Sequence, residues 1–105
     1  MNREMAIAKA IELLREAALP KRIILFGSHA RGDAREDSDV DILVVEMSCA
    51  NPFAEMVRLR RLLSPLRLPV DVLVVSEDSF RYWSDTPGNV LYEAAVEGKV
   101  LYEAP

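Results

Sequence analysis

Residues 27–45 read GSHARGDAREDSDVDILVV and join a turn of small residues to an apolar run through a strongly charged segment. The residues just before them, 22–26, read RIILF, so two runs of β type flank the charged segment. Gly27 ends the first run, and its lack of a Cβ lets the backbone approach a ligand closely. Ser28 is a favoured residue for opening a helix, and we expect a short helix over residues 28–35 between the two strands.

Two carboxylates, Asp39 and Asp41, stand where the second apolar run begins. Because a strand repeats its side-chain direction every two residues, we expect both to project from one face, about 7 Å apart along the backbone. An isolated Asp-x-Asp is usually a solvated pair of charges in a turn. Here Leu43 and Val45 continue the same face and are apolar. The two aspartates are therefore expected at the rim of a core.

A third carboxylate, Asp71, is the second residue of another apolar run, VDVLVV at residues 70–75. A lone carboxylate in such a strand is costly unless it is paired or bound to a cation. Three carboxylates that meet would repel one another and resist ionisation without a cation. A metal site resolves this conflict, and oxygen donors without a His or Cys cluster favour Mg²⁺ or Mn²⁺ over zinc. His29, the only histidine, is expected to be an exposed residue at the entry of the short helix.

The start of the expected short helix also suits phosphate binding. Free N–H groups and the positive end of the helix dipole meet there, and Ser28 adds a hydroxyl. Gly27-Ser28 before a helix is a common capping signal, so its value comes from its place between a strand and the paired aspartates. Arg31 is well placed along the chain to reach a phosphate, although a plain surface role for Arg31 is equally open.

Helices and strands alternate along the remaining sequence, which fits a single domain over residues 1–105. The apolar patterns predict helices over 3–18, 56–66, 77–84 and 87–97, and strands over 22–26, 40–45, 70–75 and, at an edge, 99–102. Pro87 suits a helix start, and Gly98 suits the helix end. Strands that are apolar on both faces indicate an α/β fold with a mixed β-sheet flanked by helices. Strand order and direction are not readable from the pattern.

Length and charge narrow the possible functions. A chain of 105 residues with a net charge of -4 is too short for a separate substrate domain and too acidic to attract nucleic acid directly. The molecule that this chain acts on is therefore expected to be presented by a second chain, and no nucleic acid partner is expected. No segment reaches the roughly 18 to 20 apolar residues of a membrane span, and charges interrupt the first 18 residues, so we expect a cytoplasmic protein. Cys49, the only cysteine, excludes an intrachain disulfide and reads as a small apolar residue after a strand.

The sequence resembles the DNA polymerase beta-like nucleotidyltransferases, and within them the minimal, MNT-type group. The resemblance covers essentially the whole chain and is most specific at Gly27-Ser28, Ala30-Arg31-Gly32, Ser38-Asp39-Val40-Asp41 and Asp71. It implies an α/β nucleotidyltransferase fold, ATP or another nucleoside triphosphate as donor, and two divalent ions, Mg²⁺ or Mn²⁺.

The resemblance also implies roles for individual residues. Asp39 and Asp41 match the paired catalytic metal ligands, Asp71 matches the third carboxylate, and Gly27 and Ser28 match the triphosphate-binding turn. Members of this size are similar to antitoxins paired with a HEPN-domain toxin, in which the small enzyme adenylylates a tyrosine of its partner. A nucleoside monophosphate, AMP in that case, would pass from ATP to a hydroxyl acceptor.

Other functions remain open from the sequence alone. A non-catalytic antitoxin could neutralise its partner by binding, through the basic helix face or an aromatic cluster, although a solvated face and ordinary packing are the simpler interpretations. The basic helix face consists of Arg58, Arg60 and Arg61, and the aromatic cluster consists of Phe80, Tyr82 and Trp83. The chain could also be the catalytic subunit of a two-chain small-molecule transferase, or part of a homo- or hetero-oligomer. A phosphohydrolase is disfavoured, because its reactive aspartate follows a strand, whereas this pair precedes one.

Overall fold

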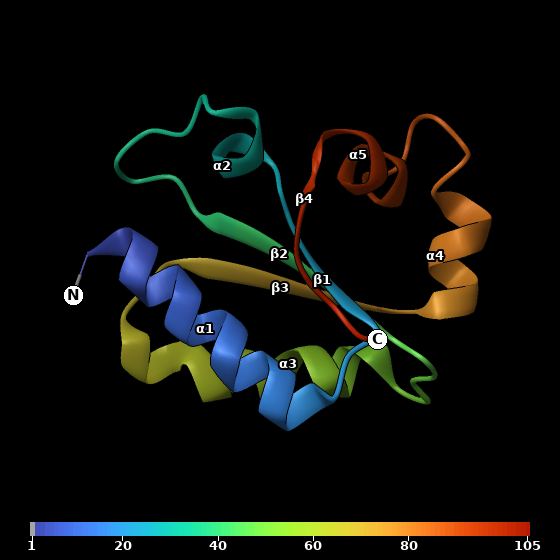
Figure 1. Cartoon of the computed structure of the whole chain (residues 1–105), viewed down its shortest axis with the longest axis horizontal. Coiled ribbons are helices and arrows are strands. Elements are labelled where there is room, and N and C mark those ends of the chain that lie inside the picture. Colours follow the sequence, from blue (N-terminus) through green and yellow to red (C-terminus); the bar gives the residue numbers. More distant parts are fainter. Residues whose placement is uncertain (1) are drawn as a thin grey trace.

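A four-stranded sheet forms the centre of the computed structural model, which describes residues 2–105 (Figure 1). The strands are β1 (Arg22–Phe26), β2 (Val40–Glu46), β3 (Val70–Ser76) and β4 (Lys99–Glu103). The helices are α1 (Arg3–Ala18), α2 (Ser28–Arg31), α3 (Pro52–Leu63), the 3₁₀ turn η1 (Ser64–Leu66), α4 (Glu77–Trp83) and α5 (Val90–Glu97). None of the helices in residues 2–105 is both long and apolar enough to cross a bilayer.

The sheet is mixed, as the sequence predicts, and its strand order is β3-β2-β1-β4. β1 runs antiparallel to β2 and β4, whereas β2 and β3 are parallel. The C-terminal end of β1 therefore meets the N-terminal ends of β2 and β3. Phe26 is paired with Asp41, and Asp41 with Asp71, at this end of the sheet.

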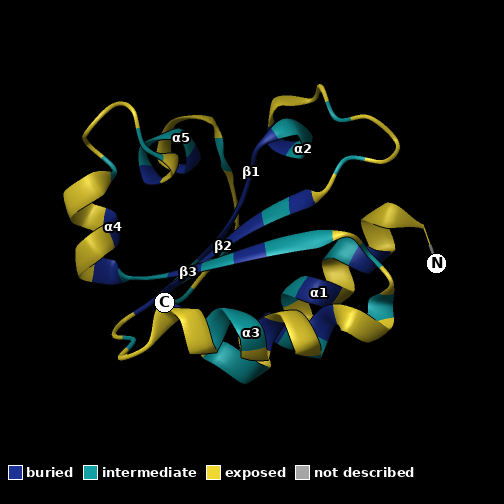
Figure 2. Cartoon of the chain, turned by 180° about the vertical axis from the view of Figure 1, so that it is seen from behind, coloured by how far each residue is buried: buried dark blue, intermediate teal, exposed yellow. Residues whose placement is uncertain are grey.

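Helices cover both faces of the sheet. α1 and α3 pack on one face, which contains Val40, Ile42 and Val44 of β2, while α4 and α5 pack on the face that contains Leu43 and Val45. Figure 2 shows β1 and most of β2 as buried and most of β3, an edge strand, as intermediate. The alternation confirms that Asp41 shares its face with the buried Leu43 and Val45, since side chains two residues apart on a strand point the same way.

Several helix boundaries differ from the sequence prediction. α3 begins at Pro52 rather than at residue 56, because the side chain of Asn51 accepts the backbone N–H of Ala54, and its α-helical part ends at Leu63, before the 3₁₀ turn η1. α2 ends at Arg31 rather than at residue 35, because Gly32 adopts a φ of 85° and turns the chain out of the helix, and Gly27 rather than Ser28 occupies the N-cap position. α5 begins at Val90 rather than at Pro87, because the side chain of Asn89 accepts the backbone N–H groups of the first turn. The predicted C-terminal edge strand is confirmed as β4.

Candidate active site

The site is built where β1 ends and β2 begins. Gly27 follows the last residue of β1 with a φ of 74°, a conformation that side chains disfavour. A Cβ placed on Gly27 would lie 2.2 Å from Oδ2 of Asp41. The carboxylate of Asp41 therefore fills the space that the absent side chain leaves, and the glycine turn and the strand carboxylate are in direct contact.

The second carboxylate reaches the same place through strand pairing. Asp71 stands opposite Asp41 in the parallel β2–β3 ladder, where neighbouring strands lie about 4.8 Å apart. Burial raises the pKa of Asp41, and the negative charges of Asp71 and then Asp39 raise it further. His29 and Arg31 oppose this shift. The three predicted carboxylates are therefore close enough for their charges to interact at one end of the sheet.

Asp39 reaches the site from a loop rather than from a strand. β2 begins at Val40, and the exposed Asp39 is the last residue before it. Nε2 of His29 lies 3.2 Å from the carbonyl oxygen of Ser38, so the ring can donate to that oxygen and hold the loop end against α2. The prediction of an exposed His29 is wrong: the residue is half-buried and contacts the loop that carries Asp39.

Asp71 has a partner that the sequence does not reveal. Arg60, on the exposed side of α3, donates through Nη2 to Oδ1 of Asp71 and, at 3.2 Å, to the carbonyl oxygen of Val72. In the sequence, Arg60 reads as one of three arginines on a solvated helix face. Only the packing of α3 against β3 brings it to this carboxylate.

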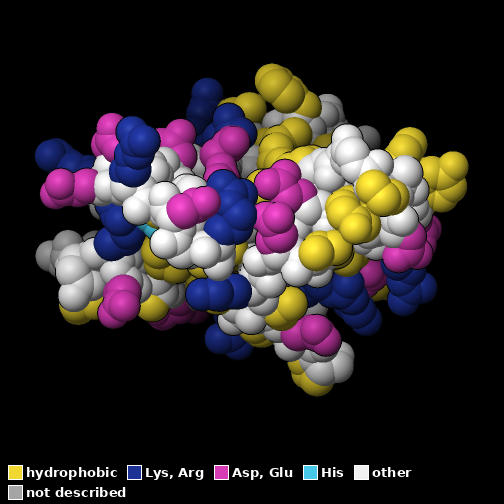
Figure 3. Space-filling model, turned by 90° about the horizontal axis from the view of Figure 1, so that it is seen from above, with side chains coloured by type: hydrophobic (Ala, Val, Ile, Leu, Met, Phe, Trp, Pro, Cys, Tyr) yellow, Lys and Arg dark blue, Asp and Glu magenta, His cyan; other side chains and the backbone are white. Residues whose placement is uncertain are grey.

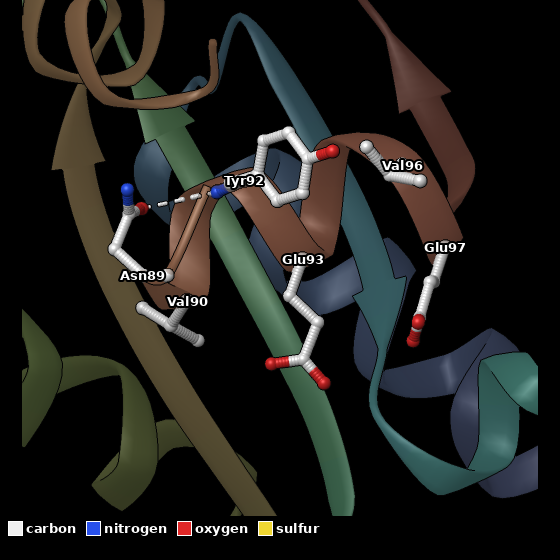
Figure 4. A pocket seen from close by; sticks show the side chains of 7 residues that line it. Asn89, Val90, Tyr92, Glu93, Val96 and Glu97 are labelled. Carbon is white, nitrogen blue, oxygen red and sulfur yellow. Dashed lines mark hydrogen bonds between the residues drawn. The ribbon is translucent and has the colours of Figure 1, made fainter. Parts of the chain in front are cut away.

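Arg31 is held between α2 and α5. Its guanidinium makes ion pairs with Asp33 at 3.3 Å, with Glu93 at 3.3 Å and with Glu97 at 3.6 Å. Figure 4 shows the Glu93 and Glu97 side chains projecting to the same side of α5, away from Tyr92. In Figure 3, which looks onto the surface above α2 and α5, basic and acidic side chains lie interspersed. A pocket of about 380 Å³ on the outer surface of α5 includes Glu93 and Glu97 but neither strand carboxylate.

The donor set fits a hard divalent cation. Carboxylate oxygens are the ligands that Mg²⁺ and Mn²⁺ prefer, and the repulsion that raises the pKa of Asp41 is one that a bound cation would relieve. Within residues 2–105, no three His, Cys, Asp or Glu side chains are gathered closely enough to form a ready-made metal cluster. Ligation by Asp39, Asp41 and Asp71 therefore stays a prediction.

The fold and the site together define a class of enzyme. Carboxylates at the head of two parallel strands, beside a glycine turn that opens a helix, are the arrangement expected from the resemblance to nucleotidyltransferases. The nucleotidyltransferase domain model matches residues 7–102, and the chain belongs to this family.

Individual relatives agree with this assignment. The chain is 37% identical to the candidate protein adenylyltransferase MJ0604 of Methanocaldococcus jannaschii, over 97% of this chain and all of that protein. It is also similar to a toxin–antitoxin complex crystallised with AMP-PNP, with 30% identity and a TM-score of 0.63 over 98% of this chain and 75% of that one. A chain of the complex between a tri-AMPylated HEPN toxin of Shewanella oneidensis and an MNT antitoxin has the same fold, with 24% identity and a TM-score of 0.64 over 98% of this chain and 74% of that one.

Proposed function

We propose that this chain transfers AMP from ATP to a hydroxyl group on a partner protein, with Asp39, Asp41 and Asp71 as the ligands of two divalent cations. The observation that carries the proposal is the contact of the Asp41 carboxylate with Gly27, opposite Asp71 in the sheet. This contact brings the glycine turn beside the carboxylate of Asp41, which supports a single site for the triphosphate and the cations. Mg²⁺ or Mn²⁺ would supply charge neutralisation of the triphosphate and a lowered pKa of the acceptor hydroxyl.

The Gly27-Ser28 turn and Asp71 have separate roles in the proposed reaction. The turn at Gly27-Ser28 offers backbone N–H groups and a hydroxyl to the triphosphate, and Gly27 leaves room for close approach. Asp71 lies on the edge strand and is 45% exposed in its side chain, so an acceptor hydroxyl can approach it from solvent and pass its proton to it. In the reaction, the acceptor oxygen forms a bond to the α-phosphorus while the bond to the pyrophosphate oxygen breaks. Positioning and electrostatics would supply the rate.

The acceptor we propose is a tyrosine of a HEPN-type toxin. The toxin–antitoxin relative at 30% identity and the M. jannaschii relative support the same acceptor class.

Co-expression with the product of the adjacent gene tests the proposal. Intact-mass spectrometry of that partner should show an increase by the mass of AMP, and peptide mapping should place it on a tyrosine. Asp41→Asn should abolish the increase, whereas Asp85→Asn, which changes an exposed carboxylate in the loop between α4 and α5, should not. Neutralisation of the partner without any mass increase, unchanged in Asp41→Asn, would instead establish a non-catalytic antitoxin. Transfer to a small molecule would overturn the acceptor class and favour a two-chain small-molecule transferase.

A further inference from the structure

Asp71 lies between a negatively charged side chain and a positively charged one. On one side it faces Asp41 across the β2–β3 ladder, and the two negative charges repel each other. On the other side, Oδ1 of Asp71 accepts from Nη2 of Arg60. A carboxylate repelled on one side and free on the other would rotate outward into solvent, so Arg60 is the contact that opposes this rotation.

The position of Arg60 follows from the sheet topology. β3 is an edge strand, and backbone groups on its outer side have no neighbouring strand. α3 packs along β3, and Arg60 reaches past this edge to the carbonyl oxygen of Val72, 3.2 Å away. The same nitrogen thus binds a fixed backbone oxygen and the carboxylate. The backbone contact anchors the guanidinium, and the guanidinium in turn orients Asp71.

The ion pair between Arg60 and Asp71 adds little to the stability of the fold. The side chains of Arg60 and Asp71 are 47% and 45% exposed, and ion pairs this exposed contribute little to folding. One oxygen of Asp71, Oδ1, receives the arginine, which leaves Oδ2 for another partner. Carboxylates that bind metal ions are themselves held by outer hydrogen bonds, and loss of such a bond costs about tenfold to a hundredfold in metal affinity.

We infer that Arg60 is a positioning residue for the cation site: it holds the Asp71 carboxylate on the side of Asp41, from where Asp71 can join the other two carboxylates when the cation binds. The inference rests on the proposed function, because it takes Asp71 as a cation ligand. It assigns Arg60 a role that the helix pattern in the sequence does not indicate.

Mn²⁺ binding in the absence of nucleotide tests this role. Binding is measured by titration calorimetry or by the loss of the electron paramagnetic resonance signal of the free ion. Arg60→Ala should bind Mn²⁺ about tenfold or more weakly than the wild type. Arg61→Ala is the matched control, because it removes the same charge from the next position of α3, where the side chain is exposed. It should bind Mn²⁺ at least as tightly as the wild type. Arg60→Lys, which keeps a charged donor, should recover part of the lost affinity.

The outcomes separate this role from the alternatives. Thermal melts without metal should differ little between Arg60→Ala and the wild type; a large loss of stability with unchanged Mn²⁺ affinity would make Arg60 structural and overturn the inference. Tighter Mn²⁺ binding by Arg60→Ala would show that Arg60 competes with the cation, which also overturns it. Equal affinity of Arg60→Ala and the wild type would refute the inference and leave the proposed function standing. Absence of Mn²⁺ binding by the wild type, with or without ATP, would refute both.

Discussion

The carboxylate of Asp41 lies against the Cα of Gly27, where its Oδ2 would be 2.2 Å from a Cβ. Two residues separated by a helix and a charged loop in the sequence therefore depend on each other. The glycine is required for the turn conformation and also for the position of the carboxylate. This dependence is the basis of the first prediction.

Gly27→Ala should impair nucleotide and metal binding together, because the new methyl group displaces Asp41. Gly32→Ala is the control, since Gly32 also has a positive φ, 85°, but nothing lies within 4 Å of a Cβ placed there. Each variant should lose about 1–3 kcal/mol of stability from backbone strain. Only Gly27→Ala should lose Mn²⁺ and ATP affinity in titration calorimetry. Equal affinities in the two variants would show that the contact with Asp41 has no role in binding.

His29→Ala should loosen the loop that carries Asp39. The ring is the side-chain contact between α2 and the carbonyl oxygen of Ser38, and its loss frees the residue next to Asp39. We expect AMP transfer to fall about tenfold, the effect of a misplaced ligand residue, and amide hydrogen exchange of residues 33–39 to accelerate. His29→Gln, whose amide nitrogen can replace Nε2 as donor, should restore both. Exchange in His29→Ala as slow as in the wild type would show that the His29 ring does not hold this loop in place.

Arg31 can be assigned either to the nucleotide or to the packing of α5 by comparing two variants. If Arg31 binds a phosphate, as its place in the sequence predicts, Arg31→Ala should weaken ATP binding about tenfold, the loss of a charge-assisted hydrogen bond. Glu93→Gln should then strengthen ATP binding, because it removes a competing carboxylate 3.3 Å from the guanidinium. If Arg31 only fastens α2 to α5, both variants should weaken binding alike. Titration calorimetry with a non-hydrolysable ATP analogue distinguishes the two results.

Glu46 makes stability depend on pH. Its side chain is buried, with 7% of the residue exposed, and burial together with the neighbouring Glu55 raises its pKa to about 7. The folded protein therefore binds this proton more tightly than the unfolded chain, and the resulting stability is lost as the pH rises through 7. Glu46→Gln should be more stable than the wild type at pH 8, and the gain should shrink toward pH 5.5.

Thermal melts across this pH range measure the effect. Glu16→Gln, an exposed carboxylate on α1, provides the control and should show no such trend. The partner carboxyl, Glu55, is held ionised mainly by Arg58, which lowers its pKa to about 2, so it contributes no change between pH 5.5 and 8. A constant difference between Glu46→Gln and the wild type over this range would contradict the assignment of the titration to Glu46.

Local patterns were sufficient to predict the strands and most helices. The run 70–75 is confirmed as part of β3, and the alternation after Asp41 correctly predicts that Leu43 and Val45 are buried on its face. The errors lie where a single residue competes with a pattern. Gly32 ends α2 early, and the side chain of Asn89 sets the start of α5 although Pro87 offers an alternative start.

The partners of the site residues were not predictable in the same way. Strand order decides that Asp71 lies opposite Asp41, and no periodicity encodes that order. Arg60 looks like any solvated helix arginine until α3 packs along β3 and brings it to Asp71. The carboxylates that we propose as cation ligands could be selected from the sequence, because their types and spacing are local. Their supporting contacts depend on packing between distant segments.

The central claim is that carboxylates from β2, from β3 and from the loop before β2 bind the cations that accompany a nucleoside triphosphate. Anomalous scattering from a crystal grown with Mn²⁺ and a non-hydrolysable ATP analogue tests this claim most directly. We predict manganese peaks within coordination distance, about 2.1 Å as for Mg²⁺, of carboxylate oxygens of Asp39, Asp41 and Asp71, with the triphosphate on the Gly27-Ser28 turn. Manganese bound elsewhere on the chain, with Asp71 directed only toward Arg60 and no phosphate at the turn, would contradict it.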